Sequence, residues 1–159
     1  MTEVRASGVA IDLRPGWEAD IRSSQTAGFG QDGEESPTIM HVANFQLPAD
    51  RGDYGGVLLT HMGPIDVFIS LIDFGLLTED QQLFSSEGIP LPLTADDFDP
   101  NTITRAIPNR SAAQLFFQAE GRGFSLYIVV GSHRDRVDMI PAINEALSSI
   151  RFERISGHT

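Results

Sequence analysis

The chain has 159 residues, 41% of them hydrophobic, which suits one domain over residues 1–159 with flexible tails at 1–7 and 155–159. Its formal net charge of −11 argues against nucleic acid and anionic membranes as partners, because both recruit clustered basic side chains. The chain has no Cys, which excludes a thiol nucleophile, a disulfide and a thiolate metal site.

Two further features of composition concern the origin and location of the protein. All 11 basic residues are Arg, a bias typical of GC-rich bacterial genomes. The first residues lack the basic start and apolar core of a signal peptide, and no apolar run approaches the length of a membrane span. A cytoplasmic bacterial protein is therefore expected, unless a precursor segment was removed.

The first expected element is a β-hairpin over residues 9–21, in which apolar side chains alternate and Pro15-Gly16 turns the chain. Trp17 opens the return strand and is the only Trp of the chain. A Trp usually packs over a hydrophobic core, although one beside a turn can also anchor a partner. A Gly-rich acidic loop follows over residues 25–37.

Two strands are expected in the next part of the chain. Residues 38–47 alternate between apolar and other side chains, so they predict a half-buried strand in which His41 is a core residue rather than a metal ligand. Residues 66–74 are apolar on both faces, which predicts a central strand. Four prolines between residues 75 and 114 favour extended connections with short helical turns.

Residues 115–130 predict a second hairpin. A two-residue turn at Gly121-Arg122 would pair Glu120 with Gly123. Side chains that share one face of this hairpin are then Leu115, Phe117, Ala119, Phe124, Leu126 and Ile128.

A helix and a last strand are expected at the end of the chain. Asp138 can cap the helix, Pro141 suits its first turn, and the helix runs to about Ser149. The apolar side chains at helical spacing are Ile140, Ile143, Leu147 and Ile150. The sequence "IRFE" then leaves the helix as a strand.

The two ends of the chain resemble the Mog1/PsbP-like family. The resemblance rests on "IDLRPGWEADI" near the start and on the strand, helix and Ser-x-Arg-Phe ending in "LYIVVGSHRDRVDMIPAINEALSSIRF". It implies an α+β fold, a Mog1/PsbP-like sandwich in which a mainly antiparallel sheet carries helices on its faces. Members include Ran-binding Mog1 proteins, PsbP subunits of photosystem II, bacterial lipoproteins and adaptor chaperones of type VI secretion effectors. Such proteins mostly bind other proteins, but no functional motif carries over residue by residue.

Residues 95–101, "ADDFDPN", place Asp97, Asp99 and the Asn that follows at the spacing that opens a calcium-binding loop. An EF-hand loop starting at Asp97 also needs Gly at its sixth position and Glu at its twelfth, and neither is present. The favoured alternative is that Thr94 or Asp96 caps a short turn while the carboxylates lie in water. No cofactor and no metal are expected, although an irregular metal site at Asp97 and Asp99 stays open.

A second chemical possibility involves His61 and Asp66. A turn at the intervening Gly-Pro could bring the two side chains together as the His-Asp pair of a hydrolase. Catalysis would also need a nucleophile or a metal, and no motif marks one nearby. An apolar-ligand carrier, with the ligand held between sheet and helix, is a further alternative.

The favoured function is a non-catalytic protein-binding module or adaptor with an unidentified, preferably basic partner, and a homodimer stays open. Recognition groups usually lie on irregular segments displayed by a scaffold. Tyr54 and Phe98 are therefore candidate anchors, with a buried plug that pins its loop as the alternative for Phe98. The candidate acidic contacts are Glu34, Glu35, Asp96, Asp97 and Asp99.

Overall fold

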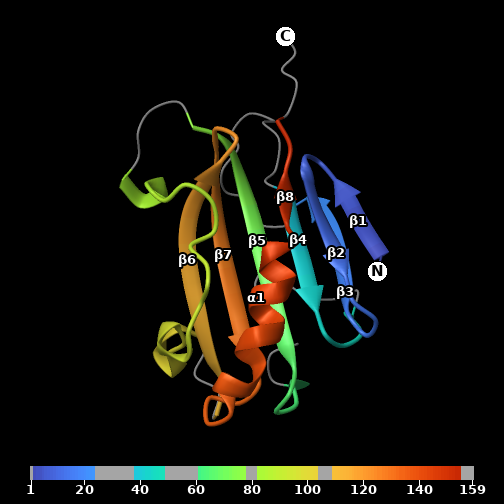
Figure 1. Ribbon diagram of the computed structural model, residues 1–159, viewed down its shortest axis with the longest axis vertical. Helices are drawn as coiled ribbons and strands as arrows, with labels where there is room; N and C mark the ends of the chain where they lie inside the picture. Colours follow the sequence, from blue (N-terminus) through green and yellow to red (C-terminus); the bar gives the residue numbers. More distant parts are fainter. Residues whose placement is uncertain (1, 24–37, 49–60, 78–81, 104–108, 155–159) are drawn as a thin grey trace.

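The computed structural model describes residues 2–23, 38–48, 61–77, 82–103 and 109–154. These residues form two antiparallel sheets, one α-helix and four short 3-10 helices (Figure 1). The strands are β1 Thr2–Ala6, β2 Val9–Leu13, β3 Glu18–Ser23, β4 Thr38–Ala43, β5 Val67–Leu76, β6 Ser111–Ala119, β7 Arg122–Val130 and β8 Arg151–Phe152. The helices are η2 Gln82–Phe84, η3 Ala95–Asp97, η4 Pro100–Thr102, η5 Arg136–Met139 and α1 Ile140–Ser148.

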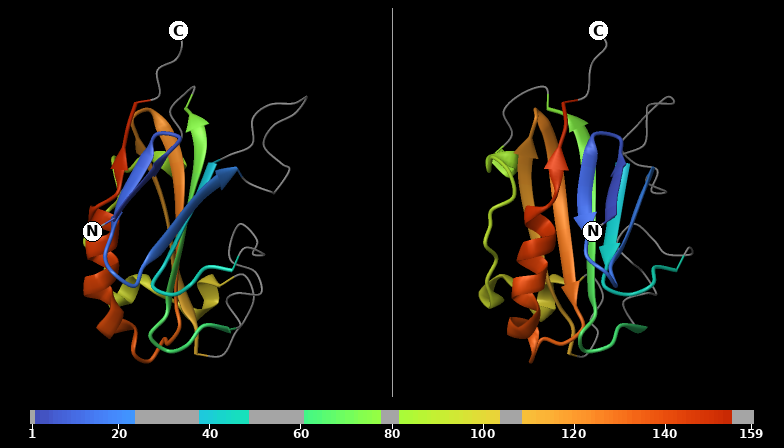
Figure 2. Two further views of the ribbon diagram at one scale, coloured as in Figure 1. Left: turned by 90° about the vertical axis from the view of Figure 1, so that its right-hand side faces the viewer. Right: turned by 45° about the vertical axis from the view of Figure 1, so that its right-hand side comes forward.

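The smaller sheet has the strand order β1-β2-β8, and the larger has the order β3-β4-β5-β7-β6. Figure 2 shows that the smaller sheet and α1 lie together on one side of the larger sheet. The prediction of a mainly antiparallel architecture is thus confirmed. The expected set of helices on the faces of the sheet is not observed, because α1 is the one α-helix of the described residues and a second sheet lies beside it.

The predicted hairpin over residues 9–21 is wrong in its pairing. β2 pairs with β1 and β8, whereas β3 pairs with β4, so the chain changes sheets at the turn that contains Gly16. The partner of β2 is the segment expected to be an N-terminal tail, and the tail prediction is wrong for residues 2–6. The β1–β2 turn at Ser7-Gly8 has φ values of 54° and 83°, the positive values that a two-residue hairpin turn requires.

The second hairpin is confirmed with a different turn. The turn residues are Glu120 and Gly121, with φ values of 51° and 76°, and Ala119 pairs with Arg122. Moving the turn by one position moves every partner by two residues, so the predicted face is preserved. The predicted register is wrong because Arg122, expected in the turn, is the first residue of β7. The Arg122 side chain is completely buried.

The main core lies between the two sheets and α1, and it draws on the predicted face of the second hairpin. Ile143 and Leu147 of α1 are 0% and 1% exposed in this core, as the helical spacing predicted. The predicted last strand is β8, and the predicted central strand is β5, which has two strands on either side. The cap prediction is wrong, because Met139 is the N-cap of α1 and Asp138 lies in η5.

A second core covers the opposite face of the larger sheet, and its buried residues are Ala43, Met62, Phe68, Ile103, Ala112, Tyr127 and Val129. β4 is therefore buried on both faces, and the prediction of a half-buried strand over residues 38–47 is wrong. The strand ends at Ala43, and Phe45 and Leu47 pack against the second core from the segment that follows.

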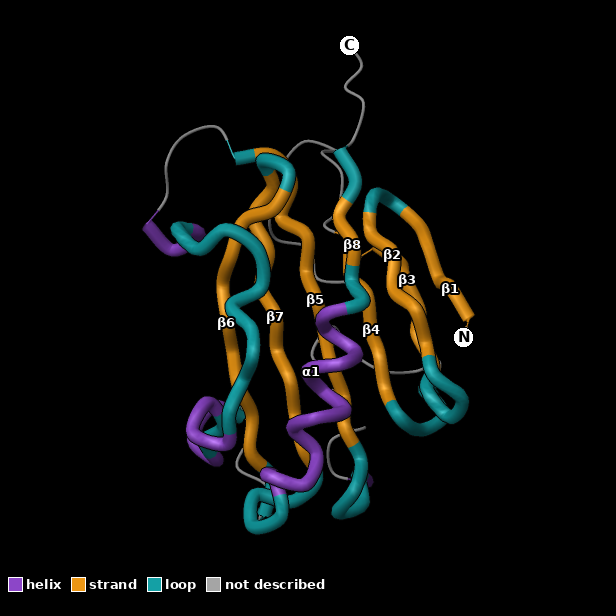
Figure 3. Tube along the Cα trace, in the orientation of Figure 1, coloured by secondary structure: helices purple, strands orange, loops and turns teal. Residues whose placement is uncertain are grey.

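Short helical turns lie beside β6, as expected for residues 75–114 (Figure 3). Backbone bridges join Glu87 to Gln118 and Asp99 to Ala112, so this segment covers both ends of the open edge of β6. Asn144 of α1 holds the segment from the other side, because its side chain accepts from Leu93 N at 2.8 Å and donates to Leu93 O at 3.0 Å. Within the described part of the chain, no helix has the length and apolar character needed to cross a membrane.

Candidate functional site

The structure separates the residues predicted for binding. Tyr54, Glu34 and Glu35 lie outside the described residues. Phe98 is 3% exposed and belongs to the main core, so its prediction as a surface anchor is wrong. The alternative is confirmed, because this ring fixes the acidic segment to the core from a position between two exposed aspartates.

Two exposed aspartates of this segment, Asp97 and Asp99, accept hydrogen bonds from backbone N–H groups at the starts of η3 and η4. Thr94 N donates to Asp97 Oδ2 at 2.7 Å, which closes a capping box at the start of η3. Asp99 caps η4, because its Oδ1 accepts from Asn101 N at 2.7 Å. The cap interpretation is therefore confirmed for Thr94, while Asp96 is exposed in the first turn of η3.

Substituting Asp97 by Asn is expected to change the free energy of unfolding by less than about 1 kcal/mol, because the amide oxygen can still accept from Thr94 N. A metal that binds the folded state raises the melting temperature until its site is saturated. Low-millimolar calcium added to chelated protein is expected to give no such rise. Asp96→Asn serves as the control for charge alone. A saturable calcium shift that Asp97→Asn abolishes and Asp96→Asn preserves would establish the metal site instead.

The proposed His61–Asp66 pair is not formed among the described residues. Asp66 Oδ2 accepts from Gly63 N at 2.8 Å, so the carboxylate closes its own turn, and His61 is exposed. The turn at Gly63-Pro64 thus exists, but it directs the Asp66 carboxylate to the backbone. The hydrolase arrangement has no geometric support at this position.

A polar row crosses the larger sheet on the face opposite α1. The register places His41 beside Asp20 on one neighbouring strand and beside Ser70 on the other, and Ser70 beside Tyr127. His41 and Ser70 are both 0% exposed, and the His41 ring lies 4.9 Å from the Phe68 ring. The prediction of His41 as a core residue is confirmed, and both His41 and Ser70 are shielded from solvent.

An ion pair between Asp73 and Arg122 is the most deeply buried charged group described. The Arg122 guanidinium donates to the Asp73 carboxylate, to Gly8 O at 3.0 Å and to Glu153 O at 2.7 Å. The pair therefore connects β5 and β7 of the larger sheet with the β1–β2 turn and with the residue after β8. Burial raises the pKa of the Asp73 carboxyl, while the Gly75 N–H and the Arg122 guanidinium oppose this rise.

The best candidate for a binding site is a small depression beside Trp17. It lies where the end of β2, the β2–β3 connection and the last turns of α1 meet. We call it the Trp17 depression, and its lining residues are Asp12, Leu13, Arg14, Trp17, Glu145, Ala146 and Ser149. Its surface is mostly apolar, and we refer to its charged and polar lining residues, Asp12, Arg14, Glu145 and Ser149, as its rim.

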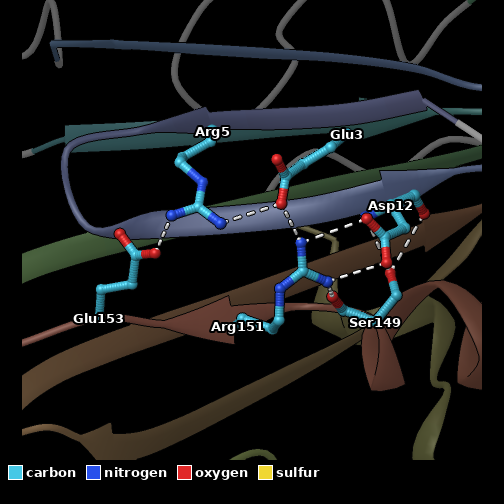
Figure 4. A network of polar contacts seen from close by, with 6 residues as sticks. All are labelled: Glu3, Arg5, Asp12, Ser149, Arg151 and Glu153. Carbon is cyan, nitrogen blue, oxygen red and sulfur yellow. Dashed lines mark hydrogen bonds and ion pairs between the residues drawn. The ribbon is translucent and has the colours of Figure 1, made fainter.

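Hydrogen bonds hold the rim of the Trp17 depression in place. Arg14 Nη1 lies 2.7 Å from Glu145 Oε1, which links the β2–β3 connection to α1. Ser149 Oγ donates to Asp12 O at 3.2 Å and accepts from Asp12 N at 3.3 Å. Arg151 donates to both carboxylate oxygens of Asp12, at 2.9 and 3.2 Å (Figure 4). The depression is thus formed in the free chain.

Of the two roles predicted for Trp17, packing over the hydrophobic core is confirmed. Its ring is half-buried and packs against the main core, and it also lines the depression. The apolar spacing of the helix did not indicate Ala146, which is 7% exposed beside the depression. The buried pair was also missed, although Asp73 inside the apolar run "FISLIDF" was a signal that a cation had to lie nearby.

No family model, no curated protein and no solved structure matches the chain. The function is therefore inferred from the geometry of the molecule itself.

Proposed function

We propose that the protein is a non-catalytic protein-binding module or adaptor that uses the Trp17 depression as its contact site. The proposal includes a Mog1/PsbP-like sandwich and a cytoplasmic location in a bacterium, both of which stay predictions. The observation that carries it is an apolar depression with a polar, hydrogen-bonded rim around the only Trp of the chain.

The geometry suits a protein partner for energetic reasons. Protein interfaces gain most of their affinity from a few desolvated anchors, often Trp, surrounded by a polar rim that excludes water. Here Leu13, Trp17 and Ala146 supply apolar surface, and Arg14 and Glu145 supply a paired rim. The small volume of about 30 Å³ fits one apolar side chain of a partner better than a whole small molecule, which normally needs a pocket of at least about 300 Å³.

The charge of the chain favours a basic partner. A net charge of −11 creates a negative field that attracts a cationic surface over a distance of about one Debye length. Raising the salt concentration from about 0.05 to 0.5 M shortens that length from about 14 to 4 Å, so association should slow more than dissociation accelerates.

The carrier interpretation has less support from the contacts. Ile143 and Leu147 of α1 pack directly into the core formed by the two sheets, so side chains occupy the place where a ligand between sheet and helix was expected. The hydrolase interpretation has less support because Asp66 is turned toward Gly63 N and not toward His61.

Trp17→Ala is expected to weaken binding of a partner by about tenfold or more, because truncation of a central aromatic anchor typically costs at least about 1.4 kcal/mol. A partner captured from the native host would be purified, and its Kd measured for the wild type and the variant. Because Trp17 is the only Trp of the chain, its fluorescence also reports binding at the depression. Saturating partner should therefore shift the fluorescence emission of the wild type.

Leu83→Ala is the matched control, because Leu83 is an apolar side chain that is 55% exposed and does not line the depression. It is expected to leave the Kd unchanged. Melting temperatures of both variants separate binding from folding, since Trp17 also packs on the core. Equal affinity of Trp17→Ala and wild type, with no fluorescence response, would contradict the proposed contact, and turnover of a small substrate would contradict the non-catalytic function.

A further inference from the structure

The outer edge of β1 is an open sheet edge. β1 is the first strand in the order β1-β2-β8, and no described strand is hydrogen-bonded to its outer edge, although β3 of the larger sheet lies near β1 (Figure 1). Glu3 and Arg5 are exposed, and Val4 between them is half-buried and packs against the main core. The strand therefore alternates a charged outer face with an apolar inner face.

The turn of the β1–β2 hairpin determines which backbone groups reach this edge. In a two-residue hairpin the pair that flanks the turn, here Ala6 and Val9, exchanges both backbone hydrogen bonds. Bonded pairs alternate along the ladder, so the N–H and C=O groups of Glu3 and Arg5 point away from β2. These are the groups that can accept another antiparallel strand.

A second copy of β1 matches this edge in charge and in hydrogen-bonding pattern. With the two-fold axis at Val4, Glu3 of each chain lies opposite Arg5 of the other, and the two Val4 side chains meet on the apolar face. The neighbouring registers place Glu3 opposite Glu3 or Arg5 opposite Arg5, which like-charge repulsion disfavours. The charge order Glu-Val-Arg is thus self-complementary in one register.

We propose that β1 is a homodimerisation edge, where two chains pair antiparallel about Val4 and join their three-stranded sheets into one continuous sheet. This inference does not rest on the Trp17 depression. In the single chain, Arg5 contacts Glu153 and lies 3.0 Å from Glu3, and Glu3 also contacts Arg151 (Figure 4). Both charged groups are thus already held on the outer face of the sheet, where a second copy would meet them.

The size of the contact predicts a reversible dimer. Two paired strands of five residues bury less than the roughly 1,200 Å² of a typical stable interface. The dimer fraction should therefore rise with protein concentration and fall with salt, since two exposed ion pairs contribute to it. A C-terminal affinity tag keeps the edge of β1 free in the experiment.

Charge reversal tests the register by sedimentation velocity. Glu3→Arg and Arg5→Glu are each expected to weaken self-association by about tenfold or more, because every cross-strand pair becomes repulsive. An equimolar mixture of the two variants should form a heterodimer of near wild-type stability. In it, positions 3 and 5 are both Arg in the Glu3→Arg chain and both Glu in the Arg5→Glu chain, so each cross-strand pair again joins opposite charges. This rescue also shows that both variants are folded.

A backbone test uses Glu3→Pro against Glu3→Thr. Both remove the carboxylate, but only Pro removes the outward N–H while leaving the ladder to β2 intact. The Pro variant should dimerise about tenfold more weakly than the Thr variant, because two symmetry-related hydrogen bonds are lost. A wild-type chain that stays monomeric at all concentrations would overturn the proposal, as would equal dimerisation of these two variants or failure of the charge-reversed mixture to associate.

Discussion

Replacing Arg122 by Met is expected to lower the free energy of unfolding by about 3–5 kcal/mol, because it leaves the buried Asp73 carboxylate without its cation. The substitution also removes the donor to Gly8 O and Glu153 O, so three acceptors lose a partner at once. Urea unfolding of the wild type and the variant measures the difference.

The pH dependence distinguishes a lost charge pair from lost packing. Arg122 lowers the pKa of Asp73, so in Arg122→Met the folded-state pKa rises further above the unfolded value of 3.8. A raised folded pKa favours the folded state at low pH, and this advantage is lost as the pH rises through the folded pKa. The destabilisation should therefore be smaller at about pH 4 than at about pH 7.

The double variant Asp73→Leu/Arg122→Met provides the control. It removes both charges, so it should be less destabilised than Arg122→Met alone, because no uncompensated ion remains in the core. A double variant that is as unstable as the sum of the two single variants would show that the pair does not act as a unit. A pH-independent effect of Arg122→Met would contradict the electrostatic explanation.

Leu147 of α1 is 1% exposed and belongs to the main core. Leu147→Ala is expected to lower the free energy of unfolding by about 2–5 kcal/mol, because it opens a cavity under α1. The range depends on how far the neighbouring side chains can move into the space. The unfolding midpoint in urea, measured at an unchanged m-value, checks the expected loss.

Ser148→Ala is the matched control in the same helix. Ser148 is exposed, and its hydroxyl donates only to Glu145 O, at 2.9 Å, so its removal should change stability by less than about 0.5 kcal/mol. Similar small effects of Leu147→Ala and Ser148→Ala would show that α1 does not pack on the sheets through Leu147.

The features of the candidate site differ in whether the sequence alone could predict them. The caps at Thr94 and Asp99 are local, because in each the side chain and the backbone group that it binds lie within three residues. The sequence indicated the cap at Thr94 correctly, whereas Asp99 was predicted as an acidic contact and not as a cap. Phe98 was ambiguous, because an apolar residue in a loop has the same sequence signature whether it faces a partner or the core. The Trp17 depression combines residues from β2 and α1 that are more than 120 positions apart, so no local pattern contains it.

The sequence by itself determined the local elements: the buried strand β5, the face of the second hairpin, and the helix that buries Ile143 and Leu147. These follow from hydrophobic period and turn chemistry, which act over a few residues. Only the tertiary structure decided which strands pair. The Pro15-Gly16 turn suits a hairpin, yet it connects two sheets, because β2 is hydrogen-bonded to β1 and β8 on its two edges and has no edge left for β3. Strand pairing depends on competition between distant segments for the same backbone groups, and that competition is settled only when the chain is folded.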